Sequence, residues 1–160
     1  MKRVFISLCL FFCFSLKVQM PYKTAVGIRL GSPEGLSFKV GLKQNTALEG
    51  IIGLHPYGMS VTSLYEKYQA SGIKKVQLFY GAGAHIGWNT YRNYYYRKDR
   101  AYFAYGNESF IGVDGVIGLE YKFDQVPFAI SFDLKPALNF YQYSGAGLYL
   151  DPGLGLKAAF

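Results

Sequence analysis

Hydrophobic and polar residues alternate along most of the chain after Pro21, and a period of two is typical of β-strands. The clearest segment is 111–123, in which the odd-numbered positions are apolar except for Gly115 and the even-numbered ones are mostly glycine or charged. Segments 128–140 and 148–160 repeat this pattern. The sequence therefore predicts eight strands, at 22–30, 36–42, 48–55, 60–69, 76–88, 111–123, 128–140 and 148–160. The faces of 60–69 stay ambiguous.

Charged residues and glycines share one face of these strands. Most strand-interior glycines alternate in phase with the charges, and only Gly50 and Gly115 alternate with the apolar residues. A solvated face has no need of small residues, whereas the interior of an eight-stranded barrel is just wide enough for side chains to fill. A polar interior with an apolar exterior is the pattern of a membrane-spanning barrel. The predicted fold class is an all-β, eight-stranded antiparallel up-and-down transmembrane β-barrel over residues 21–160.

Aromatic residues and loop lengths give this barrel an orientation. Segment Asn89–Ser109 is the longest predicted connection and lies on the outer side if both termini are periplasmic. Two prolines, Pro136 and Pro152, interrupt strands and predict bulges there. The aromatic residues expected outward at the rims are Tyr22, Tyr121, Phe123, Phe128 and Phe160 at the periplasmic side and Trp88 and Phe140 at the outer side.

Residues 1–20 differ from the rest of the chain. Lys2 and Arg3 precede an apolar run of 13 residues that Lys17 ends. This run is too short for a transmembrane helix and is typical of a cleaved secretory signal peptide, with the cut near Gln19 or Met20. Segment 10–13 (LFFC) leaves a lipoprotein cleavage box as an alternative.

Composition supports this interpretation and limits the chemistry. The 160 residues are 51% hydrophobic, with 15 Tyr and 19 Gly, which excludes a disordered chain and argues against a helical bundle. Both cysteines, Cys9 and Cys13, lie in the leader, so we expect no disulfide or thiolate chemistry in the rest of the chain. Without the leader the net charge falls from +7 to +4.

The charges predicted to face inward form the first candidate site. Unpaired charge in a tight interior is costly, so these residues are expected to pair as a network that blocks passage. A gated path for ions or protons is the alternative. The members are Arg29, Lys39, Glu49, Asp114, Glu120, Lys122, Asp133, Lys135 and Lys157.

The predicted outer loop is the second candidate site. It combines tyrosines with cations, and such surfaces suit recognition of phosphate, carboxylate or protein partners. An alternative is that two strands continue past the membrane and carry these residues in an exposed hairpin. The candidate recognition residues are Tyr91, Arg92, Tyr94, Tyr95, Tyr96, Arg97, Lys98, Arg100 and Tyr102.

Catalytic chemistry has weak support in the sequence. His55 and His85 are predicted to point inward, and with Ser60 or Ser63 and Glu49 they suggest a hydrolase, although no spacing supports it. No glycine loop for phosphate is present, and we predict no cofactor or metal. The leader disfavours nucleic acid as a partner.

Several segments together resemble a known family. The leader, the segments GLEYKF and FAISFDLKPALNF, and the end GLGLKAAF are similar to small eight-stranded outer-membrane β-barrels of the OmpX and OmpA membrane-domain type, including the short barrels common in Bacteroidota. Leu154, Leu156 and Phe160, with Ala158 between them, resemble the C-terminal signal read by the barrel assembly machinery. This resemblance implies a bacterial outer-membrane location but no particular activity.

The functional expectation is correspondingly broad. We expect a monomer with a structural or adhesive role through its extracellular loops, in contact with outer-membrane lipid and lipopolysaccharide and with a possible extracellular ligand. A narrow channel for small solutes is the alternative, and an enzyme acting on outer-leaflet lipid, like the lipid A deacylases, is the third.

Overall fold

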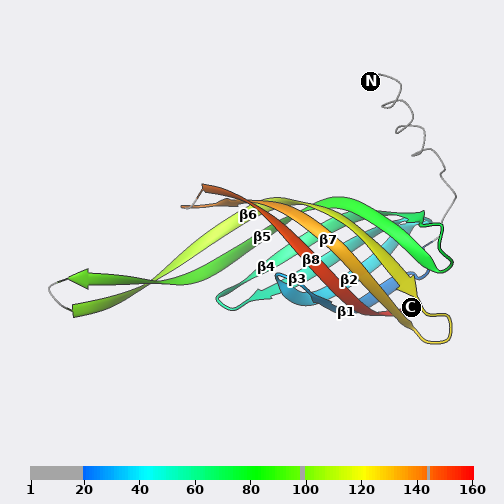
Figure 1. Cartoon of the computed structure of the whole chain (residues 1–160), viewed down its shortest axis with the longest axis horizontal. Helices are drawn as coiled ribbons and strands as arrows, with labels where there is room; N and C mark the ends of the chain where they lie inside the picture. Colours follow the sequence, from blue (N-terminus) through cyan, green and yellow to red (C-terminus); the bar gives the residue numbers. More distant parts are fainter. Residues whose placement is uncertain (1–19, 98–99, 144) are drawn as a thin grey trace, which may run out of the picture.

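The chain folds into one closed ring of eight antiparallel strands, each paired with its neighbours in sequence (Figure 1). The structure, a computed structural model, describes residues 20–97, 100–143 and 145–160, with side chains described outside 91–105. Pairing of the first strand with the last closes the ring. The predicted fold class is therefore confirmed. The strands are β1 (Thr24–Leu30), β2 (Glu34–Lys43), β3 (Thr46–His55), β4 (Gly58–Ala70), β5 (Val76–Arg97), β6 (Arg100–Lys122), β7 (Phe128–Tyr141) and β8 (Gly145–Ala159).

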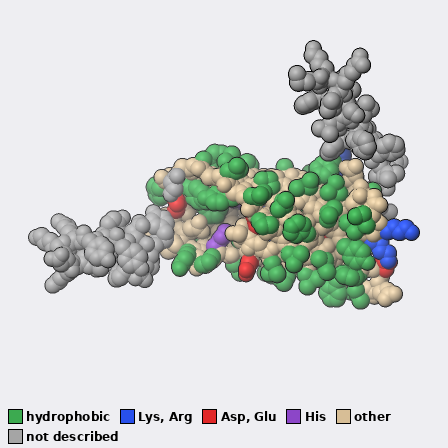
Figure 2. Space-filling view, in the orientation of Figure 1, with side chains coloured by type: hydrophobic (Ala, Val, Ile, Leu, Met, Phe, Trp, Pro, Cys, Tyr) green, Lys and Arg blue, Asp and Glu red, His purple; other side chains and the backbone are tan. Residues whose placement is uncertain are grey.

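Alternation along each strand sets which side chains face out. Leu36 of β2 is 58% exposed and Leu156 of β8 is 48% exposed, whereas the charged neighbours Lys39 and Lys157 are buried. Hydrophobic side chains cover the visible wall of the barrel, and the Lys and Arg side chains seen in this view lie at one end (Figure 2). The barrel is thus inverted relative to a water-soluble protein. No helix in ranges 20–97, 100–143 and 145–160 is long and apolar enough to cross a membrane.

The two ends of the barrel differ. The first described residues and the C-terminus meet at one of them, where the N–H groups of Lys23 and Thr24 donate to the carbonyl oxygen of Phe160. We call this the termini end. Strands β5 and β6 project from the opposite end, which we call the hairpin end (Figure 1).

The predicted Asn89–Ser109 connection is a continuation of two strands, which was the alternative to an irregular loop. Strands β5 and β6 keep one register from Val76↔Tyr121 to Arg97↔Arg100, so the segment is strand rather than irregular loop. Pairing of β5 with β4 ends at Gly58↔Asn89, and pairing of β6 with β7 ends at Phe110↔Tyr141. Eight registered pairs therefore extend beyond the neighbouring strands, about 25 Å at about 3.3 Å per residue.

The bulges predicted at Pro136 and Pro152 are not found. Strands β7 and β8 pair in one unbroken register, with Leu134↔Pro152 and Pro136↔Leu150 directly opposite. The β6–β7 ladder skips the pairs around Pro136 and resumes in the same register. The alternation of side chains therefore continues through both prolines, and only Pro136 interrupts a ladder.

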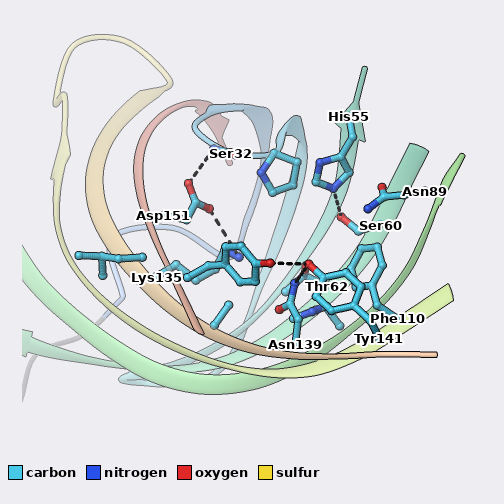
Figure 3. Close-up of a pocket in the computed structure, with 15 residues that line it drawn as sticks. Ser32, His55, Ser60, Thr62, Asn89, Phe110, Lys135, Asn139, Tyr141 and Asp151 are labelled. Carbon is cyan, nitrogen blue, oxygen red and sulfur yellow. Dashed lines mark hydrogen bonds and ion pairs between the residues drawn. The ribbon is translucent and has the colours of Figure 1, made fainter. Parts of the chain in front are cut away.

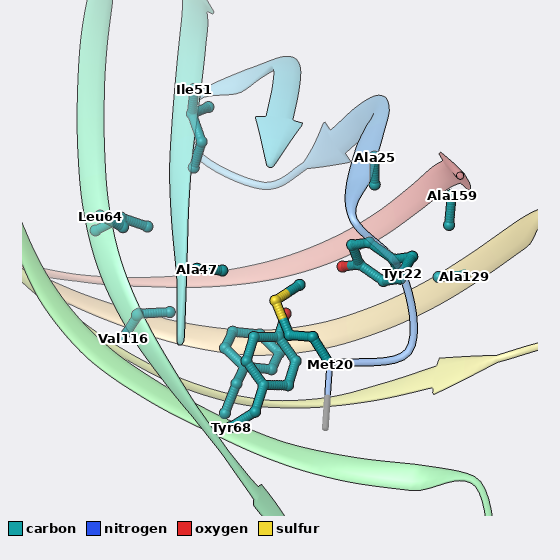
Figure 4. Packing of buried hydrophobic residues seen from close by; sticks show 11 residues of the cluster. Met20, Tyr22, Ala25, Ala47, Ile51, Leu64, Tyr68, Val116, Ala129 and Ala159 are labelled. Carbon is teal, nitrogen blue, oxygen red and sulfur yellow. The ribbon is translucent and has the colours of Figure 1, made fainter. Parts of the chain in front are cut away.

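Tyr22 also departs from the prediction, because it faces into the barrel rather than outward. Strand β1 begins only at Thr24, and the preceding residues turn across the mouth at the termini end. Tyr22 is 7% exposed and Met20 is 9% exposed (Figure 4). Apolar side chains from the barrel interior surround them. The cluster contains Met20, Tyr22, Ala25, Ala47, Ile51, Leu64, Tyr68, Phe79, Val116, Ala129 and Ala159.

Candidate functional site

Lys39 is the centre of a charge cluster in the termini half of the barrel. Its side chain is 0% exposed, and its Nζ lies 2.6 Å from Glu66 Oε2 and 3.0 Å from Glu49 Oε2. Glu120 Oε2 is 3.7 Å away, and Lys157 makes a second ion pair with Glu49, at 2.7 Å. A buried charge is tolerated only when paired in this way.

Aromatic and hydroxyl groups complete the surroundings of this cluster. Lys39 Nζ donates to the hydroxyl of Tyr68 at 2.9 Å and lies 4.6 Å from the ring centroid of Phe79. The hydroxyls of Tyr22 and Tyr68 both donate to Glu120, at 2.8 Å and 3.3 Å. Polar and aromatic groups from five strands and the N-terminal segment therefore meet around one ammonium, and they fill the lumen there.

Arg29 is the centre of a second cluster. Its guanidinium bridges two carboxylates, with Nη2 at 2.6 Å from Asp133 Oδ1 and Nη1 at 2.8 Å from Asp151 Oδ2. Arg29 Nε also donates to Asp133 Oδ1 at 3.3 Å, so two nitrogens of the guanidinium hold this carboxylate. Charge-assisted hydrogen bonds of this kind are stronger than neutral ones. Asp151 also accepts from the backbone N–H of Ser32 at 2.7 Å, which ties the β1–β2 turn to β8.

Asp114 joins the second cluster to the hairpin end. Its Oδ2 lies 2.7 Å from Nδ1 of His85, and its Oδ1 lies 3.3 Å from Nζ of Lys135. Lys135 in turn lies 3.5 Å from Asp151. The second cluster thus continues without a break from Arg29 to His85.

Inward glycines leave the space for these side chains. A methyl group added at Gly153 would collide with the guanidinium of Arg29, and one added at Gly112 would collide with the ring of His85. Glycines and charged residues therefore share one face of the strands because the charged side chains need the space that the glycines leave.

The structure brings together eight of the nine predicted interior charges. Lys122 stands apart, because its Nζ donates to the carbonyl oxygens of Phe123 at 2.7 Å and Val126 at 3.1 Å in the β6–β7 turn. Sequence reasoning missed Glu66 and Asp151 as network members. Asp151 alternates with Gly153 and Lys157 and so lies on the predicted inward face of its strand. Glu66 lies in segment 60–69, whose faces are ambiguous in the sequence.

The proposed hydrolase residues are scattered. His55 Nε2 lies 3.4 Å from Ser60 Oγ, but Ser63 faces outward and Glu49 pairs with lysines in the other half of the barrel. No carboxylate among the described residues hydrogen-bonds to His55, so this pair lacks the orienting third group of a triad. No three His, Cys, Asp or Glu side chains gather as a metal site within the described part of the chain.

The other predicted residues lie at the ends of the molecule. Tyr91–Arg97, Arg100 and Tyr102 fall on the projecting hairpin, where the strand backbone is described and the side chains are not; Lys98 lies outside the described residues. Leu154, Leu156 and Phe160 point outward near the termini end. The leader, 1–19, also lies outside the described residues.

A cavity of about 260 Å³ occupies the hairpin end of the lumen, above the second cluster (Figure 3). Asp151 and Lys135 lie at its charged side, and aromatic and amide side chains from β5, β6, β7 and β8 complete it. No motif in the sequence predicts this cavity. Its lining includes His55, Ser60, Thr62, His85, Asn89, Phe110, Lys135, Ala137, Asn139, Tyr141, Tyr149 and Asp151.

Comparisons with known proteins give one structural likeness. A scan against protein-family models and a search of curated proteins each find no match. The fold is similar to the crystal structure of the N-terminal β-barrel domain of OprF from Pseudomonas aeruginosa, with 14% sequence identity and a TM-score of 0.45. The similarity covers 84% of this chain and 94% of that chain.

Proposed function

We propose that the chain is an outer-membrane barrel protein that recognises a partner outside the cell through its projecting hairpin. The observation that carries this proposal is that β5 and β6 extend beyond the strands on either side of them. From Tyr91 to Arg97 and from Arg100 to Asn107, these strands pair with each other but with neither neighbouring strand. Each has one edge of unpaired backbone groups, and a partner with an extended segment can pair with such an edge.

The exposed hydrophobic side chains of the barrel wall, which we call the apolar belt, support an outer-membrane location. Large hydrophobic side chains from all eight strands are exposed on the barrel wall, and water would disfavour so large a surface. A hydrocarbon environment removes that penalty, and the closed ladder leaves no strand edge within the belt. The short apolar leader is consistent with export, and Leu154, Leu156 and Phe160 are the candidate assembly signal. Outer-membrane lipid and the assembly machinery are therefore proposed partners of a monomer.

The hairpin sequence suits an anionic partner. Arg92, Arg97, Lys98 and Arg100 outnumber Asp99, and three tyrosines lie between Arg92 and Arg97. Arginine binds phosphate and carboxylate groups in a bidentate manner, and tyrosine offers a large contact area at low entropic cost. Lipopolysaccharide phosphates and acidic segments of proteins have this chemistry.

A closed lumen favours recognition over transport. Lys39, Glu66, Tyr68 and Phe79 are all at most 1% exposed in the middle of the termini half. Their ion pairs and ring contacts would have to break before a solute could pass.

Replacing residues 90–107 by an Asn-Gly turn tests the recognition role. The shortened barrel should keep its heat-modifiable gel mobility, because the ladders to β4 and β7 remain, and should lose attachment to cells or matrix. Tyr57→Ala, at an exposed turn outside the hairpin, is the matched control and should attach normally. Unchanged attachment by the shortened barrel would contradict the proposal.

A further inference from the structure

We propose that the cavity at the hairpin end is a binding site for one neutral, hydroxyl-rich ligand of monosaccharide size. The site lies inside the barrel mouth and involves none of the hairpin residues beyond Asn89. It is therefore independent of the recognition role proposed for the hairpin.

The charges beside the cavity are already satisfied by one another. Lys135 lies between Asp114 and Asp151, at 3.3 Å and 3.5 Å. Asp151 also accepts from Arg29, and Asp114 also contacts His85. An anion would have to compete with two carboxylates for each cation, and a cation would have to displace an ammonium or guanidinium. Bound ions are therefore disfavoured, and a neutral ligand leaves these pairs intact.

Neutral hydrogen-bonding groups remain available around the same space. The lining includes the hydroxyls of Ser60 and Thr62 and the amides of Asn89 and Asn139. Asn139 Nδ2 donates to the hydroxyl of Tyr141 at 3.1 Å, while its Oδ1 has no partner among the described residues. Amides and hydroxyls both donate and accept, which matches the hydroxyl groups of a sugar.

One buried atom needs a partner. His85 is 8% exposed, and its Nδ1 is held by Asp114, so the ring cannot turn freely. Its Nε2 has no hydrogen-bond partner within the described part of the chain. An unsatisfied buried nitrogen is uncommon, and it calls for a water molecule or a ligand hydroxyl.

Aromatic rings form one continuous side of the cavity. The ring centroid of Phe110 lies 5.7 Å from that of His85 and 5.4 Å from that of Tyr141. Next to Tyr141 lies Tyr149, with ring centroids 6.4 Å apart and hydroxyl oxygens 3.0 Å apart. Apolar ring surface beside a few placed polar groups is the general composition of small-molecule sites. The C–H face of a pyranose packs on such rings while its hydroxyls meet the amides.

Size limits the ligand to about one sugar residue. At about 30 Å³ per water molecule, 260 Å³ holds eight or nine waters or a single monosaccharide. The same chemistry fits a free sugar and the last residue of a glycan chain. A glycan residue is linked through its anomeric oxygen, so methyl glycosides distinguish the two sources.

Saturation-transfer NMR on the refolded full barrel, in a detergent without a sugar headgroup, tests the proposal. The probes are glucose, galactose, mannose, N-acetylglucosamine and their methyl glycosides, with inorganic phosphate as the ionic competitor. At least one sugar should receive magnetisation at its ring C–H protons. Binding of methyl glycosides would identify a glycan end, and binding of free sugars alone would identify a solute.

Two variants make the result specific to the cavity. Asn139→Ala removes one hydrogen-bonding side chain and should weaken binding about tenfold. Ala137→Leu fills the space without removing a polar group and should abolish binding. This second variant still tests the proposal if Asn139→Ala does not refold. Tyr57→Ala is the control and should bind normally. No sugar binding, tighter phosphate binding, or binding unaffected by both variants would each overturn the proposal.

Discussion

The hydroxyl of Tyr22, two residues before the first strand, donates a 2.8 Å hydrogen bond to Glu120 of β6. This contact joins the start of the barrel to its far wall across the lumen, 98 positions apart in sequence. It makes the N-terminal segment a part of the interior rather than a tail.

Tyr22→Phe should lower the free energy of unfolding by about 2 kcal/mol, because a hydrogen bond to a charged acceptor is lost. Tyr22→Ala should cost more, since the buried ring also leaves a cavity. Urea unfolding followed by the gel shift measures both. Tyr57→Phe, at an exposed position, should change nothing. Equal stability of all three variants would contradict a structural role for the segment.

Arg29→Ala should destabilise the barrel by about 3–5 kcal/mol, because it leaves Asp133 and Asp151 buried with one cation removed. Gly153→Ala should also destabilise it, since the added methyl collides with Arg29. In the double variant this collision is absent, so the two effects should not add. Additive losses in urea unfolding would show that Gly153 is needed for another reason.

Planar bilayers should show no reproducible single-channel steps with the wild-type barrel. The expected cause is the packed layer of Lys39, Glu66, Tyr68 and Phe79. A known porin reconstituted in parallel serves as the positive control. Regular steps from the purified barrel would instead support the channel alternative.

Intact mass should place leader cleavage before Met20, not after it. The backbone N–H of Met20 donates to the carbonyl oxygen of Gln44 at 2.5 Å, and its side chain belongs to the buried cluster. A mature chain starting at Pro21 would lose both contacts. Finding that chain in purified outer membranes would contradict this prediction.

Lys75 and Asp124 form an exposed ion pair at the termini end, 2.5 Å apart. The hydrogen bond from Lys75 to Asp124 and the nearby charge raise the pKa of this ammonium. Any stability from the pair is complete below the ordinary lysine pKa of about 10.4 and is lost as the pH rises through the raised value. Because the pair is solvated, Lys75→Ala should leave the urea midpoint at pH 7 unchanged. A clear drop would show stronger coupling between the β4–β5 and β6–β7 turns.

Alternation made the barrel wall predictable, because a period of two decides the face of each side chain once a strand is assumed. Phe128 to Phe140 illustrate this, with every second side chain outward. The sequence left the projecting hairpin as one of two possibilities, since beyond the barrel wall neither lipid nor a packed interior selects apolar residues, and the alternation fades. Glu66 was missed because Leu64 and Tyr68 also face inward and obscure the polar face.

Tyr22 and the cavity could not be predicted for a different reason. Tyr22 precedes β1, so strand alternation does not govern it, and only the turn across the mouth directs it inward. The cavity combines residues from β3 to β8 and from the β1–β2 turn, and its shape depends on the register between strands. The pattern of residues along one strand contains neither the direction of the segment before β1 nor the register between strands.

The unbroken register of β5 and β6 has a mechanical consequence. A partner that pulls on the hairpin tip moves both strands along the barrel axis against β4 on one side and β7 on the other. Antiparallel hydrogen bonds run perpendicular to the strands, so both ladders are loaded in shear and many bonds share the force. Force on the hairpin is therefore shared among many hydrogen bonds, which suits the recognition role proposed for it.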